Sequence, residues 1–136
     1  KAEVTKVCVG ALIKNSSNRY LIIRRSNHES MPGLWEIPSG KKEFLESVEA
    51  AVLREVLEEA GLKVRLTSLA NYFEYTIEKG SETRDTVQLN FNCMVVGRDT
   101  VKLSKDHDAF AWLDLKNMGD YAFTESTKFC ILQVLK

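Results

Sequence analysis

The segment between Gly40 and Leu62 concentrates acidic residues at a spacing that favours metal chemistry. Its key charged positions are Glu46, Arg54, Glu55, Glu58 and Glu59. Carboxylates placed close together repel one another, so a positive partner is needed to hold them there. A hard divalent cation such as Mg²⁺ takes oxygen ligands and suits such a group of carboxylates.

A single helix is expected to carry three of these glutamates. Ser47 is a good N-cap, and Gly61 suits the position just past the last turn. At about 100° per residue, Glu55, Glu58 and Glu59 share one side of the helix, and apolar residues occupy much of the opposite side. A solvated charged face is the alternative. Like charges four residues apart, as in Glu55 and Glu59, destabilise a helix, which favours the metal site.

Strands are expected on both sides of this helix, because apolar and β-branched residues cluster in short runs there. The expected strands cover residues 4–14, 20–25, 63–69, 72–77, 86–96 and 109–113. A short apolar segment at 34–37 leads to a turn at 38–40, and residues 79–81 predict a hairpin turn. This order of elements favours an α/β (α+β) domain with a mixed sheet covered by helices.

Length and charge limit the classes of function. The 136 residues suit a single domain over positions 1–136. A last helix is expected over about residues 125–135, with apolar contacts from Phe129, Ile131, Leu132 and Leu135. Lys+Arg and Asp+Glu are equal at 19 each, whereas a dedicated DNA- or RNA-binding domain is usually basic. Phosphate binding must therefore come from a local site, and no nucleic-acid duplex is expected as a partner.

The cysteines indicate a reducing compartment. Cys8, Cys93 and Cys130 form no CxxC spacing and lie in apolar runs, as buried free thiols do. No apolar stretch approaches membrane-spanning length, and no signal peptide is evident. A cytoplasmic location without a membrane partner is the expectation.

Seven positions of the acidic segment match a known pattern. They are Gly40, Glu46, Arg54, Glu55, Glu58, Glu59 and Gly61. Their spacing resembles the complete Nudix box, G-x5-E-x7-R-E-U-x-E-E-x-G-U with U aliphatic, at every fixed position. The preceding LWEIPSGK segment, Arg24-Arg25 and Trp112 are similar to MutT-type members of that family. Ser39 departs from the pattern, since many relatives have glycine there.

The resemblance implies a Nudix-type α/β/α sandwich that hydrolyses a nucleoside diphosphate linked to a group X, with Mg²⁺ or Mn²⁺ as cofactor. The implied metal ligands are Glu55, Glu58, Glu59, the main-chain oxygen of Ser39, and a loop acid, Asp106 or Asp108. Glu55 is the implied general base, and Arg54 is expected to hold Glu55 or Glu58 in place. Glu46 is expected to orient the junction between loop and helix or to contact a metal through water.

The resemblance also suggests substrate contacts outside the box. Arg25 and Lys41 match positions that contact phosphate in MutT-like enzymes, and a solvent-facing role is the alternative for both. The aromatic residues that could stack on a base are Trp35, Tyr72, Phe73 and Tyr75, although strand aromatics are more often core. Thr124 or Glu125 would replace the base-reading asparagine of MutT, and a helix N-cap is the alternative for Thr124.

The role of one loop acid remains open. Asp106 is either a metal ligand or a plain surface residue. His28 and His107 lack metal-ligand spacing and are expected on surface loops.

Substrate choice lies outside the box. Signatures typical of members that cleave NADH, coenzyme A, ADP-ribose or dinucleoside polyphosphates are not found. A MutT-like nucleoside triphosphate pyrophosphatase, giving a nucleoside monophosphate and pyrophosphate, is therefore the leading class. The alternatives are an ADP-ribose or nucleoside diphosphate sugar pyrophosphatase, and a non-catalytic nucleotide-sensing module. The expected partner is a small-molecule nucleotide, bound by a monomer or homodimer.

Overall fold

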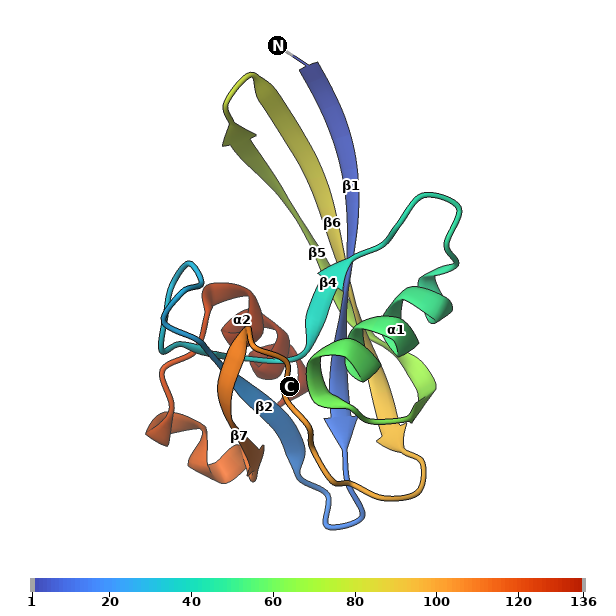
Figure 1. Cartoon of the computed structure of the whole chain (residues 1–136), viewed down its shortest axis with the longest axis vertical. Coiled ribbons are helices and arrows are strands. Elements are labelled where there is room, and N and C mark those ends of the chain that lie inside the picture. Colours follow the sequence, from blue (N-terminus) through green and yellow to red (C-terminus); the bar gives the residue numbers. More distant parts are fainter. Residues whose placement is uncertain (1, 136) are drawn as a thin grey trace.

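The computed structural model describes residues 2–135 and contains a seven-stranded sheet flanked by helices (Figure 1). The strands are β1 (Ala2–Lys14), β2 (Tyr20–Arg25), β3 (Trp35–Glu36), β4 (Ser39–Lys41), β5 (Val64–Lys79), β6 (Glu82–Val95) and β7 (His107–Leu113). The helices are α1 (Val48–Ala60), the 3-10 helix η1 (Leu115–Asp120) and α2 (Glu125–Val134). Within the described residues, none of the helices has the length and apolar character that a membrane crossing requires.

The sheet is mixed, because β1 pairs in parallel with β6 and antiparallel with β2 and β4. The strand order is β3-β2-β1-β6-β5, with β4 also pairing on β1 and β7 on β2. The β1–β6 ladder runs from Ala2 opposite Glu82 to Lys14 opposite Met94, and β5 pairs antiparallel with β6. The first half of β1 and the β5–β6 hairpin therefore extend together beyond the body of the molecule (Figure 1).

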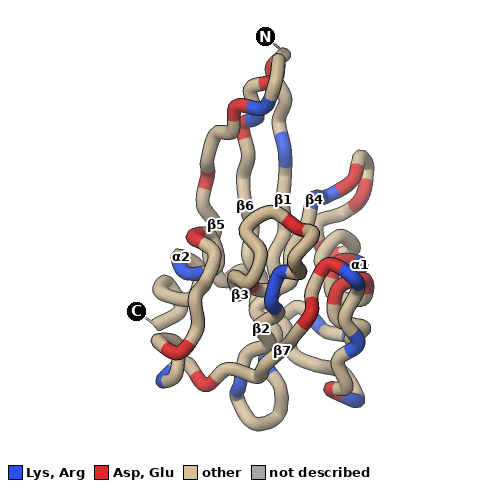
Figure 2. Tube along the Cα trace, turned by 60° about the vertical axis from the view of Figure 1, so that its left-hand side comes forward, with Lys and Arg blue, Asp and Glu red and all other residues tan. Residues whose placement is uncertain are grey.

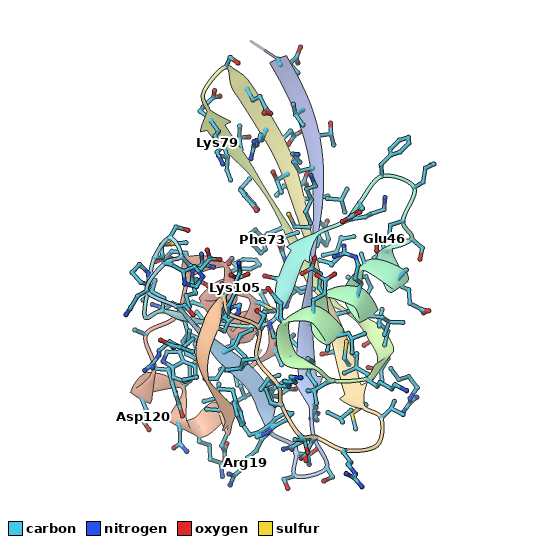
Figure 3. All side chains as sticks on the ribbon, in the orientation of Figure 1. Arg19, Glu46, Phe73, Lys79, Lys105 and Asp120 are labelled. Atoms are coloured by element: carbon cyan, nitrogen blue, oxygen red, sulfur yellow. The ribbon has the colours of Figure 1, made fainter. Side chains whose placement is uncertain are left out.

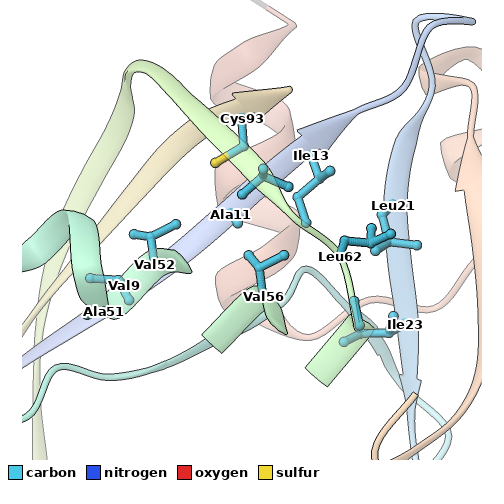
Figure 4. Close-up of a cluster of buried hydrophobic side chains, with 12 residues drawn as sticks. Val9, Ala11, Ile13, Leu21, Ile23, Ala51, Val52, Val56, Leu62 and Cys93 are labelled. Carbon is cyan, nitrogen blue, oxygen red and sulfur yellow. The ribbon is translucent and has the colours of Figure 1, made fainter. Parts of the chain in front are cut away.

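Alternating residues of the central strands face opposite sides of the sheet and build two cores. The first core joins β1 and β2 to α1 and includes Val9, Ala11, Ile13, Leu21, Val52 and Val56 (Figure 4). The second joins the other face of β1 and β2 to α2 and includes Leu12, Tyr20, Ile22, Leu113 and Ile131. The two clusters confirm the expected sandwich, in which a mixed sheet lies between helices.

Two predictions about local structure are wrong. Residues 38–40 were predicted as a turn, but Ser39–Lys41 form β4, because their backbone pairs with Cys8, Val9 and Gly10 of β1. Residues 63–69 and 72–77 were predicted as separate strands, but both belong to β5. The ladder with β6 continues across two register shifts there, and such bulges let one strand bend without ending.

The last helix packs through fewer residues than predicted. Ile131 is buried and Phe129 contacts Phe73 although it is partly exposed, whereas Leu132 and Leu135 remain exposed. Cys130 supplies part of the missing contact, because its side chain is fully buried against the second core.

Candidate active site

The ends of α1 follow from local sequence and set the positions of the box glutamates. The Ser47 hydroxyl accepts a hydrogen bond from the Ala50 N–H at 3.1 Å, and Gly61 adopts the left-handed conformation with φ of 68°. Both caps were predicted. Figure 2 shows acidic residues gathered on α1 and on the loop before it. The Glu55 side chain is 13% exposed and that of Glu58 is 57% exposed, so the acidic arc runs from a half-buried to an open environment.

Arg54 organises the outer part of this arc. Its Nε and Nη2 donate to the two carboxylate oxygens of Glu46 at 2.7 and 2.9 Å, a bidentate pair. Its Nη1 donates to Glu55 at 2.7 Å and lies 3.4 Å from Glu58. Its Nη2 also donates to the Lys41 carbonyl at 3.1 Å. Arg54 therefore ties the helix to the loop that contains Glu46, which Figure 3 labels beside α1.

The ion pair with Arg54 also fixes the charge of Glu46. Hydrogen bonds from the Arg54 side chain and from the Glu43 backbone lower the pKa of Glu46 to about 2. Arg54 was expected to hold Glu55 or Glu58, and it does contact both. Its bidentate pairing with Glu46 was not predicted.

Glu59 lies at the inner end of the arc in a different environment. Its carboxylate accepts a hydrogen bond from the Ser39 N–H at 2.9 Å. Burial, with the negative charges of Glu55, Glu36 and Asp106, raises its pKa to about 8, although the hydrogen bond from Ser39 acts in the opposite direction. Burial also raises the pKa of Glu55, against the opposing effect of Arg54. Two neighbouring carboxylates thus lie where the chain itself gives them too little positive charge.

Gly40 provides the space for the Glu55 side chain. A Cβ atom built on Gly40 would collide with the carboxylate group of Glu55. Gly40 pairs with Val9 in the sheet, so its backbone cannot move away without breaking the β4–β1 ladder. Gly40 therefore leaves the space that the Glu55 carboxylate occupies where α1 approaches β4.

These residues fit a hard divalent cation. The donors are all oxygens, from Glu55, Glu58, Glu59 and the main chain of Ser39, as Mg²⁺ prefers. The raised pKa values of Glu55 and Glu59 are those of carboxylates that a bound cation would return to the ionised form. Glu58 is the most exposed of the three and faces the solvent side of the arc.

The loop acids have separate partners. The Asp106 carboxylate lies 3.3 Å from His28 Nε2, and its charge contributes to the raised pKa of Glu59. One potential ligand atom each from His28, Glu29 and Asp106 lies within 4.8 Å of the others. Asp108 instead pairs with Arg24 at 2.7 Å on the surface. Of the two acids, Asp106 is thus the one beside the box glutamates.

Arg25 braces another carboxylate, Glu36. Its Nη1 donates to both carboxylate oxygens of Glu36 at 3.1 Å, and its Nε donates to the Ser30 carbonyl at 2.6 Å. The His107 Nε2 lies 2.8 Å from Glu36 on the other side. His107 is buried, so its predicted place on a surface loop is wrong, because β7 begins at this residue and turns the ring inward. A phosphate contact by Arg25 would compete with these bonds.

The role of Glu36 was not predicted from the sequence, and His107 was named there only as a surface residue. Glu36 belongs to the LWEIPSGK segment, but its partners were not evident because His107 lies 71 residues away in the chain. Glu36 is also close enough to Glu59 to raise the pKa of that residue.

The other predicted substrate contacts occupy different surroundings. Lys41 is exposed at the end of β4. The Trp35 ring packs edge-on against Tyr121 at 5.0 Å, and the Arg24 guanidinium lies 5.8 Å from the Trp35 centroid. Thr124 is buried and its hydroxyl caps α2 by accepting from the Thr127 N–H at 3.3 Å. The capping role that was the alternative for Thr124 is therefore the one its geometry supports.

The strand aromatics divide between the two faces of the sheet. Phe73 and Tyr75 stack with centroids 5.6 Å apart, and Phe129 of α2 meets Phe73 edge-on at 5.0 Å (Figure 3). Tyr72 is 59% exposed and alternates to the opposite face. Phe73 and Tyr75, unlike Tyr72, lie on the α2 side.

A chain of amide side chains lies beside these aromatics. Gln88 Nε2 donates to Asn90 Oδ1, and Asn90 Nδ2 donates to Asn71 Oδ1, both at 2.9 Å. Asn71 Nδ2 then donates to the Cys130 carbonyl of α2 at 3.1 Å. The alternating polar residues of β6 were a signal for one polar face, but they were interpreted only as part of a strand.

Comparisons with known proteins agree with this geometry. Residues 4–132 match the family model described as NUDIX domain. Nucleoside triphosphatase NudI of Klebsiella pneumoniae (strain 342) is 29% identical over 136 residues, covering 95% of this chain and 94% of the relative. ADP-ribose pyrophosphatase of Methanocaldococcus jannaschii is 31% identical over 121 residues, covering 86% of this chain and 66% of the relative.

Solved structures of similar proteins share this fold over nearly the whole chain. The crystal structure of MutT protein from Methanosarcina mazei Go1 superposes with a TM-score of 0.78 and 26% identity, covering 97% of this chain and 94% of that one. The family model matches nearly the whole sequence. The chain therefore belongs to the NUDIX domain family.

Proposed function

We propose that this chain is an Mg²⁺-dependent nucleoside triphosphate pyrophosphohydrolase that releases a nucleoside monophosphate and pyrophosphate. The observation that carries the proposal is the position of two carboxylates of α1 against β4: Glu59 accepts a hydrogen bond from the Ser39 N–H at 2.9 Å, and Glu55 packs against Gly40. The Klebsiella relative named nucleoside triphosphatase supports the substrate class.

The box residues would divide the work between binding and proton transfer. Glu58, Glu59, Glu55 and the main-chain oxygen of Ser39 would hold the cation, with Asp106 as a further ligand. When bound, the cation would neutralise the phosphates and acidify the attacking water. Glu55 would accept the proton of that water, and the 2.7 Å bond from Arg54 would hold its carboxylate in place.

An ADP-ribose or nucleoside diphosphate sugar pyrophosphatase is the second candidate. The Methanocaldococcus relative carries the name ADP-ribose pyrophosphatase, and the chain resembles it over 121 residues. Both candidates use the same carboxylates, so they differ only in what binds beyond the diphosphate. Both also take a small-molecule nucleotide as substrate.

A substrate panel tests the proposal. Nucleoside triphosphates, ADP-ribose and nucleoside diphosphate sugars are each incubated with the purified protein and Mg²⁺, and pyrophosphate and phosphate are measured separately. We expect triphosphates to give pyrophosphate and a monophosphate, and EDTA to abolish turnover while the melting temperature stays nearly constant. Release of phosphate alone, or preference for ADP-ribose, would contradict the triphosphate assignment.

A further inference from the structure

Asp106 lies on a loop that the chain holds beside the box. The loop enters β7 at His107, and the negative charge of Asp106 contributes to the raised pKa of Glu59. The Asp106 carboxylate lies 3.3 Å from His28 Nε2, and both of these side chains are about half exposed to solvent. A contact of this length and exposure restrains a side chain only weakly. The position of the carboxylate therefore depends on the backbone of the loop.

Ser26, the residue that directly follows β2, restrains that backbone. Its N–H donates to the Asp106 carbonyl and its hydroxyl donates to the Lys105 carbonyl, both at 2.9 Å. These carbonyls belong to the peptide units before and after the Asp106 Cα, so Ser26 holds the chain on both sides of the point where the carboxylate side chain begins. Ser26 is buried, which shields both bonds from water and makes the loss of either costly.

Ser104 holds the same loop through longer bonds. Its hydroxyl accepts from the Asp106 N–H at 3.3 Å, and its own N–H donates to the Glu59 carbonyl at 3.4 Å. Its carbonyl accepts from the His107 N–H, also at 3.4 Å. The bonds from Ser26 are the shorter ones, so Ser26 is the stronger restraint on Asp106.

The pairing of β7 with β2 determines which of two acids faces the box. The register shifts between Arg24 and Arg25, which leaves Asp108 as an extra residue in β7. Such a bulge changes the direction of a side chain. Asp108 pairs with Arg24 at 2.7 Å on the surface, whereas His107 is buried. The bulge thus directs Asp108 away from the box and leaves Asp106 as the acid beside it.

We propose that Ser26 is a positioning residue that holds Asp106 where its carboxylate can bind the divalent cation. The inference rests on the proposed function and deepens it. Residues that orient a metal ligand alter metal affinity although they do not touch the metal. Ser26 acts on the backbone around Asp106 alone among the proposed ligands, so its loss would displace this carboxylate and leave the box glutamates in place.

Manganese binding measures this role without turnover. Mn²⁺ is titrated into the metal-free protein, and the free ion is followed by electron paramagnetic resonance. In Ser26→Ala, we expect the affinity to fall about tenfold, and Ser26→Thr, which keeps the hydroxyl, should recover most of it. Thr67→Val is the matched control, because it removes a hydroxyl bond to the Asn92 carbonyl at 3.1 Å in the β5–β6 ladder. It should bind Mn²⁺ normally.

A double-mutant cycle separates positioning from a general structural role. Asp106→Asn should already lower the affinity for Mn²⁺, and adding Ser26→Ala to it should lower the affinity by less than about twofold further. Equal effects of Ser26→Ala in both backgrounds, no effect in either, or normal affinity in Asp106→Asn would overturn the positioning role. If the expected coupling is found but the wild type cleaves no triphosphate, the positioning role stands and the proposed function fails.

Discussion

The two ends of the acidic arc hold their glutamates in opposite ways. Glu46 at the outer end has a pKa lowered to about 2, because Arg54 grips both of its oxygens. Glu59 at the inner end has a pKa raised to about 8, because it is buried near other acids, and the hydrogen bond from the Ser39 N–H offsets this only in part. At the outer end, Arg54 supplies the positive charge that balances Glu46. At the inner end, the described residues supply no such charge to Glu59.

The difference separates structural from catalytic acids within one motif. Arg54 donates hydrogen bonds to Glu46, Glu55 and the Lys41 carbonyl. These bonds hold the loop before α1 against the helix. Within residues 2–135, no ion pair to Glu59 is found. The family pattern treats all of these positions alike, but this difference is the reason why we propose a structural role for Glu46 and cation binding for Glu59.

Loss of the base between the two ends should have the largest effect. We expect Glu55→Gln to lower kcat by about 10²–10⁴-fold, the range typical of a general base. Its fold should persist, because glutamine keeps the shape of the side chain. Glu49→Gln, an exposed first-turn acid of the same helix, is the control and should retain activity. Near-normal turnover of Glu55→Gln with Mg²⁺ would move the base to another glutamate.

Filling the space beside Glu55 should have the next largest effect. In Gly40→Ala, the new methyl group would displace the Glu55 carboxylate, so activity should fall more than tenfold and the free energy of unfolding by about 1–3 kcal/mol. Chemical denaturation and kinetics measure the two effects. Gly119→Ala meets no atom within 4 Å and should change neither. A fully active Gly40→Ala variant would show that the close approach is not needed.

The smallest effects are opposite dependences of stability on pH in the metal-free protein. Folded Glu59 has a pKa of about 8 against an ordinary 4.5, so it keeps a proton that the unfolded chain releases. Its contribution to stability is present below about pH 4.5 and is lost as pH rises towards 8. Folded Glu46 has a pKa of about 2, so its contribution is present above about pH 4.5 and is lost as pH falls towards 2.

Urea unfolding across this pH range measures both contributions. Glu59→Gln should remove the loss of stability between pH 5 and 8, and Glu46→Gln should remove the loss at acid pH. Identical pH profiles for the two variants would mean that the two ends of the arc are electrostatically alike.

Features set by neighbours in the chain could be predicted from the sequence. Ser47 and Gly61 bound α1 because an N-cap hydroxyl and a left-handed glycine act within one turn. The shared face of Glu55 and Glu59 follows from helical periodicity alone. A mixed sheet could be predicted, but the order of its strands could not, because that order depends on which distant segments pair.

Features that depend on distant contacts could not be predicted. Arg54 reaches Glu46 because the loop before α1 lies beside the helix, with Leu45 at a φ of 63°. His107 was misplaced because its partner Glu36 lies on another strand. The β4 backbone appeared as a turn because proline and glycine flank Ser39, and only β1 provides the pairing that extends it.

The parallel pairing of β1 with β6 has a consequence for assembly during synthesis. β1 pairs with β6, which lies about 80 residues later in the chain. Most of the protein must therefore leave the ribosome before the β1–β6 ladder can form. Until then, β4 has only an incomplete sheet to dock on, and the surface under Gly40 is not fixed. Although α1 is formed by residues close in sequence, its position against β4 is therefore fixed only after the β5–β6 hairpin has emerged from the ribosome.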